Sequence, residues 1–249
     1  MKIAKQSVEL IDFMGSDLAI VNAARVSFAK ESDWIYDKVY SYEGHDEKHL
    51  SEKDQKLITY LAKHNHWSPF AHTSLQFRIK APIFVARQLV KHQVGGVWNE
   101  VSRRYVDDEP EFFFPDVWRG KPVNAKQGSS GIITELVHEK DSEDLWADVN
   151  NYWKIPMHIE AQVEQSLSMY NWLLRSNVAP EQARMILPQN IMTEWIWTGS
   201  LYFFARVCNL RLDPHAQEET REIASLITKS IPKEFEQSWK VLINDYNKN

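Results

Sequence analysis

The stretch TSLQFRIKAPIFVARQLVKHQVGG (residues 73–96) contains a strand signal followed at once by a helix signal. In residues 73–80, apolar or β-branched positions alternate strictly with polar ones, which predicts a strand buried on one face only. Pro82 suits the first position of a helix, and we expect this helix to run to about His92. Gly95-Gly96 then ends the regular structure, because glycine permits a turn or a close approach of the backbone to a ligand.

The pattern on either side of this stretch predicts an α+β protein in which helices outnumber strands. On the helix after Pro82, the pairs Arg87/Lys91 and Gln88/His92 are each four residues apart, so two polar ridges are expected. The other predicted elements are helices at residues 51–64, 157–175, 180–188, after Ser200 and at 214–227, and a strand at 190–198. Ser51, Ser200 and Asp213 are the expected N-caps. We expect one domain over residues 1–249, with an irregular excursion at about 109–151.

Composition limits the class of partner. The 249 residues carry a formal net charge of -5, which argues against general binding to nucleic acid or to an anionic membrane surface. Residues 78–104 nevertheless contain six Lys or Arg against one acid, Glu100, so a small anion is the better candidate. The single cysteine, Cys208, and the lack of a long apolar run favour a cytoplasmic protein without disulfides or membrane spans.

Several common sites are absent or weakly indicated. The chain has eight glycines but neither a G-x-G-x-x-G nor a P-loop pattern, so a nucleotide must be held by cations or a helix end. His45, His49, His64, His66 and His72 lack the spacing of a catalytic metal site, and surface or hydrogen-bonded roles are favoured. Cys208 lies in an apolar segment that favours burial, and Ser102 lies beside two arginines, which favours binding an anion over nucleophilic attack.

Together these residues resemble the flavin-dependent thymidylate synthases, the ThyX family. The family signature is R-H-R, a seven-residue spacer, and a serine within N-E-x-S-x-R-Y. This chain has KHQ at 91–93, eight residues, and then Ser102 within NEVSRRY at 99–105. Further matching blocks are AARVSF (23–28), HWSPFAH (66–72), APIFVARQ (81–88), ARMILP (183–188) and NLRLDPHAQ (209–217).

The resemblance implies a central, mostly antiparallel sheet flanked by helices and the reductive methylation of dUMP to dTMP. It implies 5,10-methylenetetrahydrofolate as carbon donor, NADPH as electron source and FAD as hydride carrier. Arg211 is the expected activating residue, because a fixed guanidinium would stabilise negative charge on the pyrimidine as N3 ionises. His66 is the second expected catalytic residue. The residues expected to hold dUMP are Gln88, Lys91, Glu100, Ser102, Arg103, Arg104, Arg184 and Arg211.

The flavin site is also assigned through the resemblance. The expected flavin-binding residues are Ser68, Lys91, His92, Gln93, Glu100, Ser200 and Arg206. Lys91 and Gln93 replace the two arginines of the signature, and Ser200 and Arg206 stand where the family commonly has asparagines. Lysine keeps the charge without the planar fork, and glutamine keeps only neutral hydrogen bonding. The resemblance further implies a homotetramer with active sites shared between chains.

Two alternatives stay open on the sequence. One keeps the reaction but uses Cys208 as a covalent thiolate. The other is a catalytically impaired dUMP-binding protein that has lost flavin chemistry, which the altered KHQ motif would explain.

Overall fold

The computed structural model describes residues 1–37, 47–106, 108–123, 128–133 and 155–243. The chain divides into two compact units. Unit 1 comprises Met1–Gln6, Lys80–Arg87 and Glu100–Glu194, and unit 2 comprises Ser7–Ile79, Gln88–Asn99 and Trp195–Asn249. The two units are described separately below. The single domain predicted over residues 1–249 stays a prediction.

A four-stranded, mostly antiparallel sheet has the order β2-β5-β10-β6. Its strands are β2 (Ser7–Met14), β5 (Ser74–Pro82), β10 (Met192–Gly199) and β6 (Gly96–Glu100). The alternation predicted for residues 73–80 is confirmed, because Leu75, Phe77 and Ile79 are fully buried while the residues between them are half-buried or exposed. Gln76 Nε2 donates to Thr198 Oγ1 at 3.1 Å on neighbouring strands. Together with the helices, this sheet confirms the α+β class.

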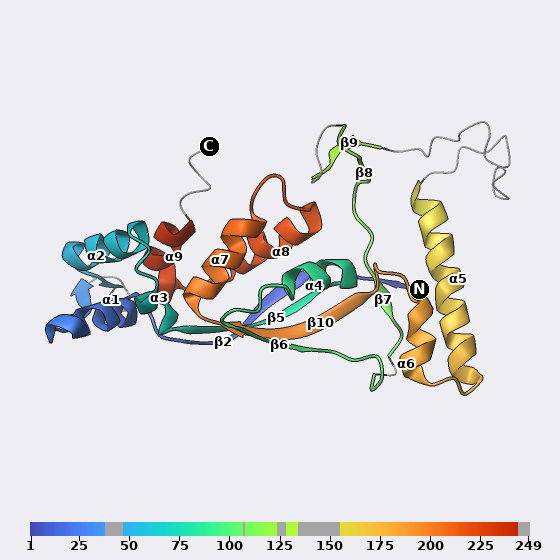
Figure 1. Ribbon diagram of the computed structural model, residues 1–249, viewed down its shortest axis with the longest axis horizontal. Coiled ribbons are helices and arrows are strands. Elements are labelled where there is room, and N and C mark those ends of the chain that lie inside the picture. Colours follow the sequence, from blue (N-terminus) through green and yellow to red (C-terminus); the bar gives the residue numbers. More distant parts are fainter. Residues whose placement is uncertain (38–46, 107, 124–127, 134–154, 244–249) are drawn as a thin grey trace, which may run out of the picture. The chain divides into compact units, whose positions relative to one another are not determined.

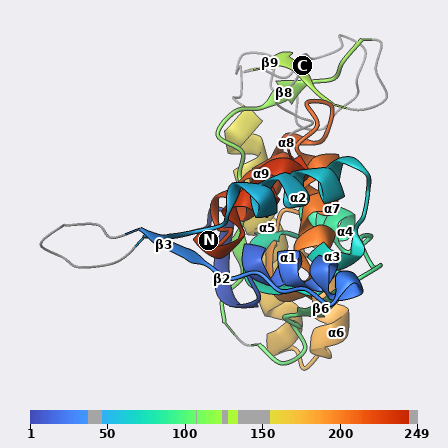
Figure 2. The same cartoon turned by 90° about the vertical axis from the view of Figure 1, so that its left-hand side faces the viewer.

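Unit 2 has a core of buried aliphatic and aromatic side chains. Figure 1 shows the helices of this unit. These are α1 (Asp17–Arg25), α2 (Glu52–Lys63), α3 (Ser68–Ala71), α7 (Leu201–Arg211), α8 (Glu218–Lys229) and α9 (Glu236–Ile243), with 3₁₀ turns at Val26–Phe28 and Lys233–Phe235. Helix α7 packs against α8 and α9, and α2 packs against α9, as Figure 2 also shows. Strands β3 (Ile35–Asp37) and β4 (Glu47–His49) pair in antiparallel fashion.

Two helix starts in unit 2 were predicted correctly. The Ser51 hydroxyl accepts a hydrogen bond from the Asp54 N–H at 3.2 Å, and the Ser200 hydroxyl accepts one from the Phe203 N–H at 3.1 Å. Each side chain satisfies an amide that the first helical turn leaves without a partner.

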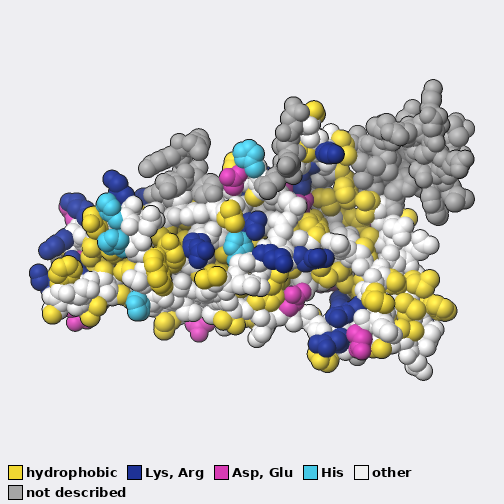
Figure 3. Space-filling model, in the orientation of Figure 1, with side chains coloured by type: hydrophobic (Ala, Val, Ile, Leu, Met, Phe, Trp, Pro, Cys, Tyr) yellow, Lys and Arg dark blue, Asp and Glu magenta, His cyan; other side chains and the backbone are white. Residues whose placement is uncertain are grey.

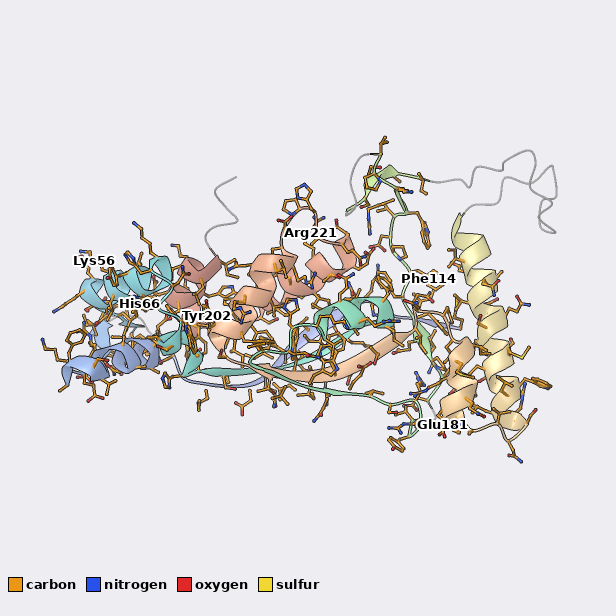
Figure 4. The ribbon with its side chains drawn as sticks, in the orientation of Figure 1. Lys56, His66, Phe114, Glu181, Tyr202 and Arg221 are labelled. Carbon is orange, nitrogen blue, oxygen red and sulfur yellow. The ribbon has the colours of Figure 1, made fainter. Side chains whose placement is uncertain are left out.

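Unit 1 is built on the long helix α5 (Ile155–Arg175). Its other elements are β1 (Lys2–Ile3), β7 (Glu111–Phe112), β8 (Arg119–Gly120), β9 (Ser130–Ile132), α6 (Pro180–Ala183) and a 3₁₀ turn at Arg184–Ile186. Val163, Leu167 and Tyr170 of α5 pack on Phe112 and Ile191. Figure 4 labels Phe114, which packs against this core, and Glu181 on α6.

The predicted boundary at Pro82 is wrong. Strand β5 runs through Pro82, because the Ile83 N–H still donates to the Ile191 carbonyl at 3.0 Å, and helix α4 (Ile83–Leu89) begins only there. The helix also ends earlier than predicted. His92 donates to the Leu89 carbonyl in a tighter turn, so the two polar ridges predicted along this helix do not form.

The predicted start of the helix at Asp213-Pro214 is also wrong. Asp213 Oδ1 accepts the His215 N–H at 2.7 Å within a turn, and α8 begins at Glu218 after Gln217. Helices α1 and α9 were not predicted. The N–H groups of Gln237 and Ser238, in the first turn of α9, donate to the buried carboxylate of Asp17 in α1. This contact joins residues far apart in the sequence, so no local sequence pattern predicts it.

The excursion predicted at 109–151 lies partly within the described residues. Its described part contributes β7, β8 and β9, with β7 parallel to β1 and β8 antiparallel to β9. Residues 134–151 lie outside the described residues.

Candidate active site

Arg211 and His92 form a hydrogen-bonded pair in unit 2. Arg211 is the last residue of α7, and its Nε donates to His92 Nε2 at 3.0 Å. Burial, followed by the positive charges of Arg211 and Arg206, lowers the pKa of His92 to about 4. The imidazole is therefore neutral near pH 7, and its acceptor role at Nε2 places the ring proton on Nδ1.

This pairing holds the Arg211 guanidinium in place without neutralising it. The side chain is half-buried, and burial lowers the pKa of the guanidinium, which stays charged near neutral pH. Because its Nε is used by His92, the two terminal NH₂ groups keep the paired geometry that planar oxygen acceptors match. The structure thus places the predicted catalytic arginine beside the predicted flavin ligand His92.

Three cavities of unit 2 share one residue, Arg206. Lys91, His92, Gln93 and Phe203 line the smallest, of about 110 Å³. Trp67, Gly95, Val97, Ser200 and Tyr202 are among the residues lining the largest, of about 610 Å³. The third, of about 140 Å³, includes His66, Asn65, Trp67, Tyr202 and Asn209. Among the described residues, no Asp or Glu lines any of the three.

His66 and Tyr202, both labelled in Figure 4, border the 140 Å³ cavity from the α2–α3 connection and from α7. His66 also packs edge-on against Tyr60, and Trp67 lies 6.2 Å from Tyr202 between ring centroids. Figure 3 shows Lys and Arg side chains, with a histidine among them, on the surface beside α7. Cationic and aromatic side chains therefore meet around these cavities.

The glycine pair has two separate explanations. Gly95 has φ +89, a conformation that side chains rarely adopt. A Cβ on Gly96 would lie 2.4 Å from the Phe203 ring, so its missing side chain makes room for Phe203. A Cβ on Gly199 would lie 2.3 Å from the same ring. The close approach at Gly96 thus serves internal packing, whereas Gly95 lines the cavity of about 610 Å³.

Gln88 is used inside unit 2. Its Nε2 donates to Gln217 Oε1, and its Oε1 accepts from Thr220 Oγ1 at 3.2 Å. Both ends of the amide therefore anchor helix α8, and binding of substrate by Gln88 would require one of these bonds to be exchanged.

In unit 1, a cavity of about 520 Å³ brings together three predicted substrate residues, Glu100, Arg103 and Arg184. Thr193 Oγ1 donates to Glu100 Oε1 at 2.7 Å, and the Arg103 guanidinium donates to the Asp108 carbonyl. Arg184 is exposed, and its side chain makes no hydrogen bond or ion pair within the described part of the chain.

The positive excess of residues 78–104 does not carry over to this cavity. Its lining contains Lys2, Lys80, Arg103 and Arg184 against Glu100, Asp108, Glu109, Glu111 and Glu194. Lys80 pairs with Glu111 and Lys2 with Glu109. Of the cations counted along residues 78–104, only Lys80 and Arg103 line this cavity, and they lie among acids that come mostly from just beyond that window, together with Glu194.

Three further predicted residues, like Gln88 and Arg211, line none of the cavities described above. Arg104 Nε donates to Ser102 Oγ at 3.1 Å, and the Arg104 guanidinium lies 4.9 Å from the centre of the Tyr105 ring. Ser68 is an exposed residue at the start of α3.

Cys208 is fully buried, and its thiol donates to the Ala224 carbonyl at 3.6 Å. Burial raises the pKa of the thiol to about 12. A thiolate is therefore unfavourable at neutral pH, which argues against the covalent alternative.

Sequence reasoning missed several residues that line the cavities, among them Trp67, Thr193, Tyr202 and Asn209. Asn209 Nδ2 donates to the Leu242 carbonyl at 2.9 Å, while its buried Oδ1 has no partner among the described residues. Asn209 is the first residue of the NLRLDPHAQ block, and this position could have identified it as a site residue. The sequence did not distinguish Trp67 and Tyr202 from core residues, because aromatic residues most often pack in cores.

Comparisons with known proteins agree with one another. The family profile described as thymidylate synthase complementing protein matches residues 9–236. A flavin-dependent thymidylate synthase of Thermosipho africanus is 36% identical over 93% of this chain and 90% of its own length. One of Thermotoga neapolitana is 38% identical over 90% of this chain and 85% of its own length.

A solved structure has the same fold. The crystal structure of a UMP/dUMP methylase, PolB, from Streptomyces cacaoi, bound with 5-Br dUMP, superposes with a TM-score of 0.74 at 26% identity. The superposition covers 98% of this chain and 97% of that one. No helix in the described part of the chain is long and apolar enough to cross a bilayer.

Proposed function

The chain belongs to the family of flavin-dependent thymidylate synthases, and on this premise we propose how its own residues divide the work. The reaction is the reductive methylation of dUMP to dTMP, with 5,10-methylenetetrahydrofolate as carbon donor and NADPH as electron source. The observation that carries the proposal is the charged Arg211 guanidinium, held by a neutral His92 beside cavities lined by cations and aromatic rings.

Arg211 is the activating residue. The bond from Nε fixes the orientation of the guanidinium. Its remaining N–H donors are therefore already oriented before charge develops on the pyrimidine. As N3 of the uracil ionises, these donors stabilise the negative charge, and C5 becomes the better carbon nucleophile. The chain then needs no nucleophile of its own, which agrees with the buried, protonated Cys208.

The residues around α7 fit a flavin. Its ring system is planar and apolar and its diphosphate is anionic, which matches the aromatic side chains Trp67, Tyr202 and Phe203 and the cations Lys91 and Arg206. FAD, when bound, supplies the hydride transfer that side chains cannot perform. Ser200 and Gln93 would donate neutral hydrogen bonds, and His66, on the 140 Å³ cavity, would contact the folate side.

The dUMP phosphate needs cations. The guanidinium of Arg184 has no partner among the described residues, and Arg103, which lines the same cavity, uses one N–H on a backbone carbonyl. Ser102 and Arg104, already hydrogen-bonded to each other, would serve as a further pair of donors. The homotetramer with shared active sites, and the cytoplasmic location, stay predictions that size measurement and cell fractionation can test.

The direct test is the visible spectrum of the purified protein. We expect flavin absorbance that bleaches on addition of NADPH, and dTMP formation when dUMP and 5,10-methylenetetrahydrofolate are added. A protein that stays colourless after incubation with FAD, yet binds dUMP, would support the impaired binding protein instead. Separate titrations with FAD and dUMP distinguish the two outcomes.

A further inference from the structure

The side chain of Arg206 differs from three other arginine side chains of unit 2 in having no partner among the described residues. Arg25 is paired with Asp54, Arg211 with His92 and Arg221 with Glu218. The Arg206 side chain is exposed on α7, borders three cavities, and makes no hydrogen bond or ion pair with any residue that the structure describes. A free guanidinium facing cavities without carboxylates provides donors for an anion.

The residues that share the smallest cavity with Arg206 supply little charge. Gln93 is neutral, and His92 is neutral near pH 7 because burial and the nearby arginines lower its pKa to about 4. Lys91 is the other cation in the lining. The charge of this cavity therefore depends on Lys91 and Arg206 together, and the loss of either would halve it.

We propose that Arg206 takes over the cationic contact that Gln93 cannot make, so that the flavin diphosphate is held from helix α7 as well as from the turn after α4. The signature that the chain resembles has arginine where Gln93 stands and asparagine where Arg206 stands. Both residues line one cavity of about 110 Å³. Relative to the signature, this cavity therefore loses one positive charge at Gln93 and gains one at Arg206, and its total charge stays the same. This inference rests on the proposed function, because it presumes flavin as the ligand.

The test is a double-mutant cycle on FAD affinity. FAD is removed from the purified protein, and the dissociation constant is measured by flavin fluorescence titration. For Arg206→Asn we expect binding weaker by about 10-fold to 100-fold, the range for one charge-assisted contact. The salt dependence of binding should become shallower, because one fewer cation meets the phosphates.

Gln93→Arg in the same protein provides the rescue. We expect the double variant Gln93→Arg/Arg206→Asn to regain most of the lost affinity, and Gln93→Arg to tighten binding more in the Arg206→Asn background than in the wild type. The matched control is Arg175→Asn, which makes the same charge change on an exposed residue of α5 that lines none of these cavities. Circular dichroism establishes that each variant is folded.

The possible outcomes distinguish the role of Arg206 from the proposed function of the protein. FAD binding that is unchanged in Arg206→Asn, or a double variant as weak as the single one, overturns the exchange of charge and leaves the function standing. Wild-type protein that takes up no FAD overturns both.

Discussion

The cavities of the two units differ in how many carboxylates lie beside their cations. In unit 1, five carboxylates line the cavity beside four cations, and Lys2 and Lys80 are each paired with one of them. In unit 2, the cavities around Arg206 have no carboxylate in their described lining, and Arg211 bonds to a neutral histidine. An ion pair cancels a charge, whereas a bond to a neutral acceptor only orients it. Unit 1 therefore sets its two arginines, Arg103 and Arg184, among carboxylates, whereas the cations of the unit 2 cavities face none in the described lining.

The largest effect is expected from Arg211→Ala in unit 2. Turnover should fall by about a hundredfold or more, the size expected when one preorganised electrostatic contact is lost. Steady-state kinetics with saturating dUMP provide the measurement. Arg211→Lys is the matched variant, since it keeps the charge but loses the fork and the bond from Nε to His92, and its turnover should be intermediate. Turnover near the wild-type value in Arg211→Ala would remove this residue from the mechanism.

The corresponding change in unit 1 is Arg184→Ala. We expect a KM for dUMP raised by about tenfold, with kcat changed much less, because Arg184 is assigned to binding the nucleotide and not to activating it. Arg103→Ala should have the smaller effect, because its guanidinium already donates to the Asp108 carbonyl. A large fall in kcat in Arg184→Ala, with KM unchanged, would contradict the division of roles between the two units.

A pH dependence should follow from the neutral His92. Its folded pKa of about 4 lies below the ordinary value of 6.5, so the unfolded chain takes up a proton first as the pH falls. The stability present above pH 6.5 is therefore lost progressively as the pH approaches 4. Urea unfolding at about pH 7 and about pH 5 measures the difference, which should be smaller in His92→Gln. Equal pH dependence in the two proteins would show that folding does not lower the pKa of His92.

The smallest effect on activity is expected from Cys208→Ala. Turnover should stay within about twofold of the wild-type value, while stability falls by about 1 kcal/mol because a small buried side chain is truncated. Loss of turnover in a variant that is still folded would restore the covalent thiolate and break the contrast between charged binding residues and an inert core.

Features that depend on neighbours in the chain were predictable from the sequence. The alternation in β5, the N-caps Ser51 and Ser200 and the turn at Gly95 each follow from local backbone and side-chain geometry. The family blocks led to the reaction and to Arg211, since chemistry requires particular residue types in order along the chain.

Features that depend on contacts between distant residues were decided only by the tertiary structure. The bond from Ile83 to Ile191 extends β5 past Pro82, Gln217 and Thr220 occupy the amide of Gln88, and Arg211 and Arg206 contribute to keeping His92 neutral. The cations counted along residues 78–104 likewise line different cavities: Lys80 and Arg103 lie among carboxylates in unit 1, and Lys91 lines a cavity of unit 2. The physical reason is that pKa, pairing and burial depend on distance in space, and sequence spacing determines that distance only within a helix, a strand or a turn.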